Sequence, residues 1–141
     1  MRDYKKIKAW QLADDMVVAV YGTTRSFPQR EVYGLTSQVR RAAYSCAANI
    51  AEGASRASKK DYLHFLYIAR GSLAETEYFL HLSHRLEYIE SKSHEQIRQQ
   101  VQEAQACLYG LIKAVEKEAN PVSRTISKVT SALAITFASL H

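Results

Sequence analysis

Apolar residues recur every three or four positions along most of the chain, which is the spacing of helices that bury one face. The first such segment runs from about Tyr4 to Thr24 and the second from about Leu35 to Glu52, where Gly53 is expected to cap the helix. Between them, Pro28 and Gly34 indicate a loop. The second segment is rich in alanine, so neighbouring backbones can approach it closely.

Two longer helices are predicted in the second half of the chain. Ser58 and Asp61 have the form of a capping box, and the helix that follows is expected to continue through Gly71 to about Ile89. A fourth helix is expected after a cap at Ser93. The apolar seams step by four and three residues: Tyr62, Leu66, Ala69, Leu73, Thr76 and Leu80, then Ile97, Val101, Ala104, Leu108, Leu111 and Val115. Such seams predict an all-α fold, an antiparallel up-down-up-down four-helix bundle.

The third predicted helix carries a second apolar stripe, formed by Phe65, Phe79, Leu82, Leu86 and Ile89. One internal core does not need two stripes on the same helix. We therefore expect a homo-oligomer in which a neighbouring copy covers one of them.

The bundle is predicted to occupy residues 1–119, because Asn120 and Pro121 end the fourth helix. Residues 120–141 form a tail rich in Ser, Thr and Ala, with only two charged residues before His141. Its apolar residues keep a rough helical spacing: Val122, Ile126, Val129, Leu133 and Leu140. Because β-branched and hydroxyl residues lower helix propensity, a disordered tail and a docked helix both stay open.

The composition fits one globular domain. The chain has 141 residues, 47% hydrophobic and 23% charged, which is enough for one core and too little for a multidomain enzyme. No stretch reaches the ~18 apolar residues of a membrane span, so we expect a cytoplasmic protein with no membrane partner. Cys46 and Cys107 lie in apolar helical patterns and are expected to be reduced, packed thiols.

Positive charge is concentrated in the first half of the chain. Residues 1–60 hold eleven Lys or Arg against five Asp or Glu, although the net charge is only +5. The candidate nucleic-acid-binding residues are Arg40, Arg41, Arg56, Lys59 and Lys60. If several project from one end of the bundle they can neutralise phosphates, with Tyr44 or Tyr62 stacking on bases. Alternatively, the first two pair with acids of the third or fourth helix and the lysines only hydrate a loop.

Glu52 and Glu75 form a second candidate cluster. An acid pair of this kind serves proton transfer in some enzymes, but no nucleophile accompanies it here. A semi-buried charge needs a partner, so we favour structural ion pairs of these glutamates with Arg41 or Arg70 across helices.

No catalytic signature is present in the sequence. It has no glycine-rich phosphate loop, no nucleophile elbow and no zinc-ligand spacing, so we expect neither enzyme activity nor a cofactor. His81, His84 and Glu77 share a helix face and are the strongest metal candidates. A di-metal site in a bundle needs Glu-x-x-His on two helices, so we expect no metal here.

Five short segments occur in the order and spacing of a known family: AWQLA from residue 9, FPQREVYGL from residue 27, QVRRA from residue 38, NIAEG from residue 49 and IARGSLAE from residue 68. Across about residues 4–118 the chain resembles the 23S ribosomal RNA intervening-sequence protein family, also called the bacterial four-helix bundle protein family. The motif positions carried over are Gln38, Arg40, Arg41, Asn49, Glu52, Gly53, Arg56, Gly71, Ser72 and Glu75.

The resemblance implies a four-helix protomer that assembles as a ring-like homopentamer. Family members are encoded in some bacteria within sequences inserted into the large ribosomal RNA gene, have no known enzyme activity and are suspected of binding RNA. Relatives of similar shape are accessory proteins of diversity-generating retroelements, where they bind nucleic acid and a reverse transcriptase.

These observations favour a non-enzymatic oligomer that binds structured RNA through its basic surface. The alternative is an oligomeric scaffold or adaptor for a protein partner such as a reverse transcriptase. A metal-dependent bundle enzyme is the least favoured hypothesis, because the metal-ligand pattern is incomplete.

Overall fold

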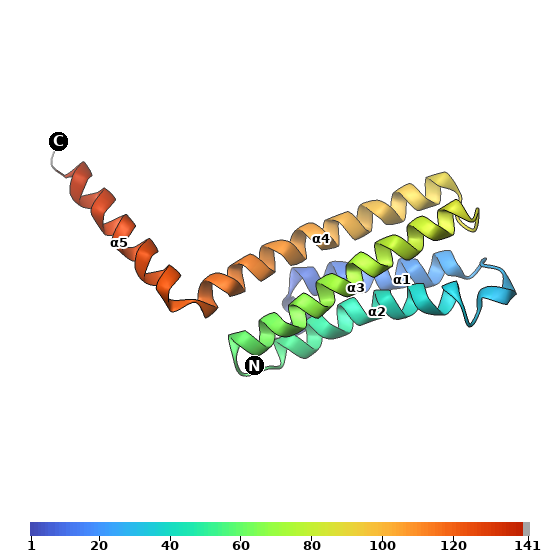
Figure 1. Ribbon diagram of the computed structural model, residues 1–141, viewed down its shortest axis with the longest axis horizontal. Coiled ribbons are helices and arrows are strands. Elements are labelled where there is room, and N and C mark those ends of the chain that lie inside the picture. The colour runs from blue at the N-terminus through green and yellow to red at the C-terminus, as the bar shows by residue number, and fades with distance from the viewer. Residues whose placement is uncertain (140–141) are drawn as a thin grey trace.

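The protein is all-α, as the sequence predicts, in a computed structural model that describes residues 1–139 and their side chains except those of residues 121, 123, 124 and 127. Helices α1 (Lys8–Thr24), α2 (Leu35–Ala54), α3 (Lys59–Arg85) and α4 (Ser91–Ala119) lie side by side, and α5 (Pro121–Ala138) projects away from them (Figure 1). Two short 3-10 helices, η1 (Tyr4–Lys6) and η2 (Gln29–Glu31), precede α1 and α2. In the described range no helix is long and apolar enough to cross a bilayer.

The four long helices enclose one core. α1 and α3 each contact both α2 and α4, and consecutive helices are joined at alternate ends of the molecule (Figure 1). The starts of α1 and α3 and the ends of α2 and α4 therefore lie at the same end, which we call the proximal end. The opposite end, with the α1–α2 and α3–α4 connections, is the distal end.

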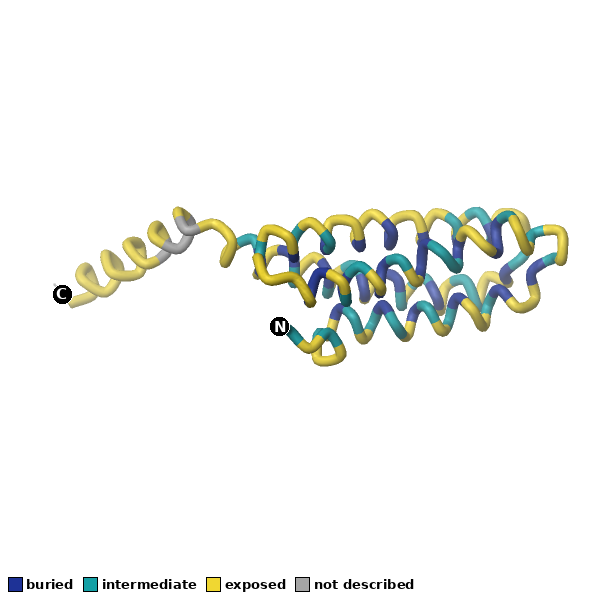
Figure 2. The backbone as a smooth tube through the Cα atoms, turned by 90° about the horizontal axis from the view of Figure 1, so that it is seen from below, coloured by how far each residue is buried: buried dark blue, intermediate teal, exposed yellow. Residues whose placement is uncertain are grey.

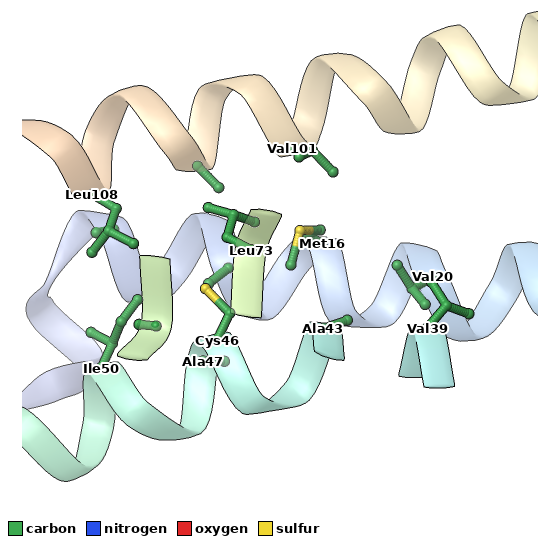
Figure 3. Close-up of a cluster of buried hydrophobic side chains, with 14 of the residues drawn as sticks. Met16, Val20, Val39, Ala43, Cys46, Ala47, Ile50, Leu73, Val101 and Leu108 are labelled. Atoms are coloured by element: carbon green, nitrogen blue, oxygen red, sulfur yellow. The ribbon is translucent and has the colours of Figure 1, made fainter. Parts of the chain in front are cut away.

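The predicted seams form this core. Met16, Val39, Ile50, Leu73 and Leu108 point inward from all four helices (Figure 3). The buried positions lie on the sides of α1 to α4 that face one another, whereas the described side chains of α5 are exposed (Figure 2). Every residue of the predicted α3 seam is buried.

The α4 seam differs from its prediction at one position. Ile112 is 1% exposed and occupies the core, whereas Leu111 is only half-buried. A helix with 3.6 residues per turn drifts relative to a strict seam of 3.5, and after Leu108 the inward position falls four residues on.

The predicted start of α3 is correct, but the helix ends at Arg85 and not near Ile89. Ser58 caps α3, because its Oγ accepts a hydrogen bond from the backbone N–H of Asp61 at 3.0 Å. At the other end α3 stops at Arg85, since Glu87 adopts the left-handed backbone region with φ 63°. Ile89 is nevertheless buried, in the connection rather than in the helix. The helix α4 then begins at Ser91, so the predicted cap at Ser93 is wrong.

The second apolar stripe of α3 is largely covered within the chain. Phe79 and Leu82 are half-buried and pack against the core, and Phe65 is half-buried as well. Only Leu86 is substantially exposed, at 46%. This stripe therefore does not by itself require a second copy, contrary to the prediction.

Gly53 is not a helix cap, because α2 continues to Ala54. Its role is to let α2 and α3 approach closely. A Cβ at this position would lie 2.9 Å from both Tyr62 Cδ2 and Phe65 Cβ. Side-chain contacts this short do not occur in packed interiors, so only glycine fits without movement of α3.

The segment before α2 closes the distal end of the core, where it contacts the α3–α4 connection. Phe27 is buried, and the centroids of the Phe27 and Tyr88 rings are 5.5 Å apart. The Glu31 carboxylate accepts hydrogen bonds from the Leu35 N–H at 2.9 Å and from the Tyr88 hydroxyl at 3.2 Å. It thereby pairs one of the backbone N–H groups in the first turn of α2, which have no acceptor within the helix. A Cβ at Gly34 would lie 2.7 Å from that carboxylate. The FPQREVYGL motif thus has a structural role.

Both cysteines are free thiols, and Cys46 is packed in the core as predicted. Burial raises the pKa of Cys46 to about 12, which keeps this thiol protonated and unreactive at neutral pH. Cys107 is half-buried at the edge of the core.

The tail is helical from Pro121 to Ala138, and its described side chains are exposed. The Asn120 side chain caps α5 by accepting a hydrogen bond from the Val122 N–H at 3.3 Å. Contacts between α5 and the other helices are confined to α4. Leu140, which continues the predicted spacing, lies outside the described residues.

Candidate nucleic-acid interface

The five predicted cations occupy two separate places. Arg56, Lys59 and Lys60 lie at the proximal end, in the connection between α2 and α3 and the first turn of α3. Arg40 lies on α2 about 21 Å before its last residue, at a rise of ~1.5 Å per residue. Arg40 and Arg41 therefore do not share one surface with the other three.

Arg40 packs between α1 and α2. Its Nε donates a hydrogen bond to the Thr24 hydroxyl at 2.8 Å, and its guanidinium lies 4.6 Å from the centre of the Tyr21 ring. The residue is half-buried. These contacts assign Arg40 a structural role.

Arg41 pairs with Glu75 across α2 and α3. Its Nη2 lies 2.8 Å from Glu75 Oε2, and its Nε donates to Gln38 Oε1 at 3.2 Å. The two charged side chains are 41% and 49% exposed, so this ion pair is more hydrated than the sequence suggested. Water and dissolved salt screen most of the attraction between such groups.

We therefore expect Arg41→Ala to lower the free energy of unfolding by no more than about 1 kcal/mol. Urea titration of the wild type and the variant, followed by circular dichroism, measures the difference. Glu75→Ala is the matched control and should cost about the same amount. A loss of several kcal/mol would show that the pair is far less screened than its exposure indicates.

The other predicted ion-pairing residues behave differently. Glu52 pairs with Arg56 one turn further along the chain, with Oε1 and Nη2 2.5 Å apart, rather than across helices. Arg70 lies over the ring of Tyr67, 5.1 Å from its centre, and takes part in no ion pair among the described residues. The expected pairing of Arg70 with a glutamate is therefore wrong.

Uncharged side chains continue the contact between α2 and α3. The hydroxyls of Ser45 and Ser72 are 3.0 Å apart, and Asn49 Nδ2 donates to the Ser45 carbonyl at 2.8 Å. The Asn49 bond lies within α2, whereas the Ser45–Ser72 contact and the pair Arg41–Glu75 cross to α3 and favour one register of the two helices. These contacts give a structural reason for the motif residues Arg41, Asn49, Ser72 and Glu75, with no ligand involved.

Sequence reasoning missed Arg2, which joins the N-terminal segment to the proximal end. Its Nη1 donates to the Arg56 carbonyl at 3.1 Å, and its backbone N–H donates to the Ala54 carbonyl at 3.3 Å. Its guanidinium lies 4.4 Å from the centre of the Tyr62 ring. An antiparallel order of the first two helices predicts this meeting, because it places the start of the first beside the end of the second.

The result is a cluster of cations that we call the cationic end: Arg2, Lys5, Lys6, Lys8, Arg56, Lys59 and Lys60. Arg56 is paired with Glu52, and Lys59 Nζ lies 3.0 Å from Glu118 Oε2 on α4. The exposed lysines at positions 5, 6, 8 and 60 form no ion pair with any described residue. Their charges face solvent and are available to a partner.

The distal end is nearly balanced in charge. Its cations are Arg25, Arg30, Arg85, Lys92 and Arg98, and its acids are Glu31, Glu87, Glu90 and Glu95. Arg98 is paired with Glu95, with Nη2 and Oε1 2.9 Å apart. With Lys113 and Lys117, the proximal end has nine cations, against the five acids Asp3, Glu52, Asp61, Glu116 and Glu118. The distal end has five cations against four acids, so the positive excess of the packed helices is larger proximally.

The two predicted stacking residues are not equivalent. Tyr62 is 2% exposed and covered by Arg2, so it is unavailable to a base and that prediction is wrong. Tyr44 is 48% exposed but lies on α2 about 15 Å before its end, at ~1.5 Å per residue. Neither tyrosine can therefore stack on a base at the cationic end, where the groups open to a ligand are positively charged side chains.

The predicted metal candidates lie on the α3–α4 face. His81 and Glu77 line a hollow of about 300 Å³ together with His94. The rings of His84 and His94 stack with centroids 4.4 Å apart, and burial, followed by the nearby positive charge of His84, lowers the pKa of His94. Within residues 1–139 no group of three or more His, Cys, Asp or Glu is arranged to hold a metal ion.

The fold and the cationic end define a small all-α protein that gathers positive charge at one end of its packed helices. The chain belongs to the 23S rRNA-intervening sequence protein family, whose model matches residues 5–110, and this confirms the resemblance seen in the sequence. The match ends within α4, so α5 lies outside it.

The solved structures that are similar to this chain include one from a related family. It is a protein with unknown function from the S23 ribosomal protein family of Bacteroides thetaiotaomicron, with 27% sequence identity and a TM-score of 0.69. The similarity covers 74% of this chain and 95% of that one. No curated protein matches the chain.

Proposed function

We propose that the chain is a non-enzymatic, homo-oligomeric four-helix bundle protein that binds structured RNA at its cationic end. The observation that carries this proposal is the hydrogen bond from Arg2 to the Arg56 carbonyl, because it brings two basic segments together. The family name, which refers to ribosomal RNA, supports RNA as the polyanion. Of the residues predicted for this role, Arg56, Lys59 and Lys60 remain, and Arg2, Lys5, Lys6 and Lys8 join them.

The chemistry of the cationic end favours contact with phosphates over reading of bases. Lysine presents a flexible point charge, whereas recognition of base edges relies on planar or bidentate groups. The unpaired lysines lose no internal ion pair when they meet a phosphate. We therefore expect binding that depends on the shape and charge of the RNA and only weakly on its sequence.

The proposed assembly is an antiparallel up-down-up-down bundle that forms a homopentamer in the cytoplasm. Its support is the family resemblance. A ring would present several cationic ends to one polyanion, and contacts made together bind far more tightly than one alone, through effective concentration.

A salt titration tests the proposed function. We expect a purified RNA hairpin to bind the full chain at low salt, with the logarithm of the association constant falling linearly with the logarithm of the KCl concentration. Fluorescence anisotropy measures the constant, and an uncharged polymer of similar length is the control. Absence of binding at low salt, or binding that is indifferent to salt, would contradict the proposal.

An adaptor role is the second candidate, and exposed aromatic residues favour it. Tyr33, Tyr78 and Tyr109 are 95%, 57% and 58% exposed, and tyrosine is enriched in protein interfaces. Affinity capture with and without nuclease separates the two functions. A protein partner retained after nuclease treatment indicates the adaptor, whereas loss of all partners indicates nucleic acid.

A further inference from the structure

Two tyrosines on the outside of α3 and α4 each have a cation over their ring. On α3, the Arg70 guanidinium lies 5.1 Å from the centre of the Tyr67 ring, and on α4, Lys113 Nζ lies 5.3 Å from the centre of the Tyr109 ring. The tyrosines are 40% and 58% exposed, and both cations are exposed as well. We call these four residues the tyrosine–cation patch.

Glu116 joins the two halves of the tyrosine–cation patch. The Tyr67 hydroxyl donates a hydrogen bond to Glu116 Oε1 at 2.9 Å, and Lys113 Nζ donates to Glu116 Oε2 at 3.4 Å. The bond from Tyr67 lowers the pKa of Glu116, so the carboxylate is ionised at neutral pH. These bonds hold the Tyr67 ring in one orientation before a ligand arrives, which reduces the entropy cost of binding.

The patch keeps a positive charge after this internal pairing. Both carboxylate oxygens of Glu116 are engaged within the cluster, and Lys113 offsets the charge of Glu116. Arg70 forms no ion pair with any residue that the structure describes. Its charge is therefore left for an anionic partner, such as a phosphate.

The patch continues the cationic end along the outside of the bundle. Lys59 at the start of α3 lies 3.0 Å from Glu118 of α4, and the bond between Tyr67 and Glu116 follows further along the same two helices. Tyr67 lies about 12 Å beyond Lys59 along α3, at ~1.5 Å per residue. A strand that leaves an RNA helix docked at the cationic end can therefore run along this side.

An unpaired nucleotide has the two groups that a tyrosine and a neighbouring cation can bind together. Its base has a flat π face that stacks on an aromatic ring, and its phosphate pairs with the cation. The bases of duplex RNA are stacked inside the helix, so they cannot reach the rings. Stacking tolerates any base, in agreement with the weak sequence preference expected for the cationic end.

We propose that the tyrosine–cation patch binds unpaired nucleotides next to the RNA helix held by the cationic end, with one base on Tyr67 and another on Tyr109. This inference rests on the proposed function, because the cationic end positions the strand. The preferred partner is thus an RNA in which a single-stranded segment leaves a duplex.

Three forms of one RNA hairpin test the proposal by fluorescence anisotropy with the full chain. The first ends blunt, the second carries about six unpaired nucleotides, and the third carries the same extension without its bases. The second is expected to bind about 30-fold more tightly than the first, which corresponds to two base stacks at the lower end of their usual strength. The third has the same phosphates and is expected to bind within about threefold of the first.

Substitutions in the patch separate stacking from a general effect on the surface. Tyr67→Leu and Tyr109→Leu are each expected to lower the gain from the extension about fivefold, whereas Tyr109→Phe keeps the ring and the gain. Binding of the blunt hairpin should be unchanged in all three variants, with circular dichroism to verify helicity. Tyr33→Leu is the matched control, because Tyr33 is 95% exposed but lies in the α1–α2 connection at the distal end.

Three results would overturn the proposal. An abasic extension that gives the full gain would show that only phosphates are bound. A gain that survives in both leucine variants of the patch, or falls equally in Tyr33→Leu, would place the bases elsewhere. Unchanged RNA binding in Tyr109→Leu, together with loss of a protein partner that resists nuclease, would assign the patch to a protein.

The blunt hairpin distinguishes failure of this inference from failure of the proposed function. If the blunt hairpin binds and the extension adds nothing, the proposed function stands and only the role of the patch is wrong. If the blunt hairpin does not bind even at low salt, the proposed function is wrong, and this inference falls with it.

Discussion

Replacing Lys5, Lys6 and Lys60 by glutamate is expected to lower the affinity of the protein for an RNA hairpin by about 100-fold at about 0.1 M salt. These side chains are exposed and unpaired, so their charges are available to phosphates. Each lysine that neutralises a phosphate releases condensed counterions, and a glutamate adds repulsion as well. The slope of log K against log salt should become shallower by about 2 to 3, one contact for each lysine.

The matched control reverses the same number of charges at the distal end. Arg25→Glu, Arg85→Glu and Lys92→Glu change the net charge equally but leave the cationic end intact. Anisotropy titrations of both triple variants, with circular dichroism to verify helicity, should show a large loss only for the proximal one. Equal losses would show that RNA responds to net charge alone, and no loss in either would remove the cationic end as the binding site.

Gly53→Ala is expected to destabilise the protein by about 2 kcal/mol, because the new methyl group collides with α3. Its Cβ would lie 2.9 Å from Phe65 Cβ and 2.9 Å from Tyr62 Cδ2, and the carbonyl oxygen of Tyr62 is 3.2 Å away. Phe65 Cβ and the Tyr62 carbonyl are held close to the backbone of α3, so rotation of a flexible side chain cannot relieve the clash. Urea unfolding at constant temperature measures the difference.

Gly71→Ala is the control for this substitution and should have the opposite sign. Gly71 also lies inside a helix, but a Cβ there meets no other atom within 4 Å. Alanine is a better helix former than glycine, so this variant should gain about 0.5–1 kcal/mol. Destabilisation of both variants to the same extent would mean that close packing of α2 and α3 does not explain the glycine at position 53.

Periodicity alone predicted the helices and most of the buried positions. The α3 seam from Tyr62 to Leu80 is buried throughout, because burial of one helix face leaves a direct imprint on the sequence. Helix ends were less predictable. Glu87 ends the α3 region in a left-handed conformation that gives no sequence signal, since that region ordinarily favours glycine.

The candidate site was predicted only in part, because neighbours in sequence are not neighbours in space. Arg40 was grouped with Lys60, yet a long stretch of α2 separates them. Arg2 was overlooked, although its contact with Arg56 unites the two basic segments. Whether an arginine packs against a neighbouring helix, as the half-buried Arg40 does on Tyr21 of α1, depends on the rotation of its helix, which the sequence pattern does not fix.

The unequal ends of the core give the molecule an electric dipole along its length. The field of a polyanion exerts a torque on this dipole, so a polyanion that binds as proposed would meet the cationic end first. Because α5 follows α4 at this same end, a polyanion that binds as proposed would lie next to α5.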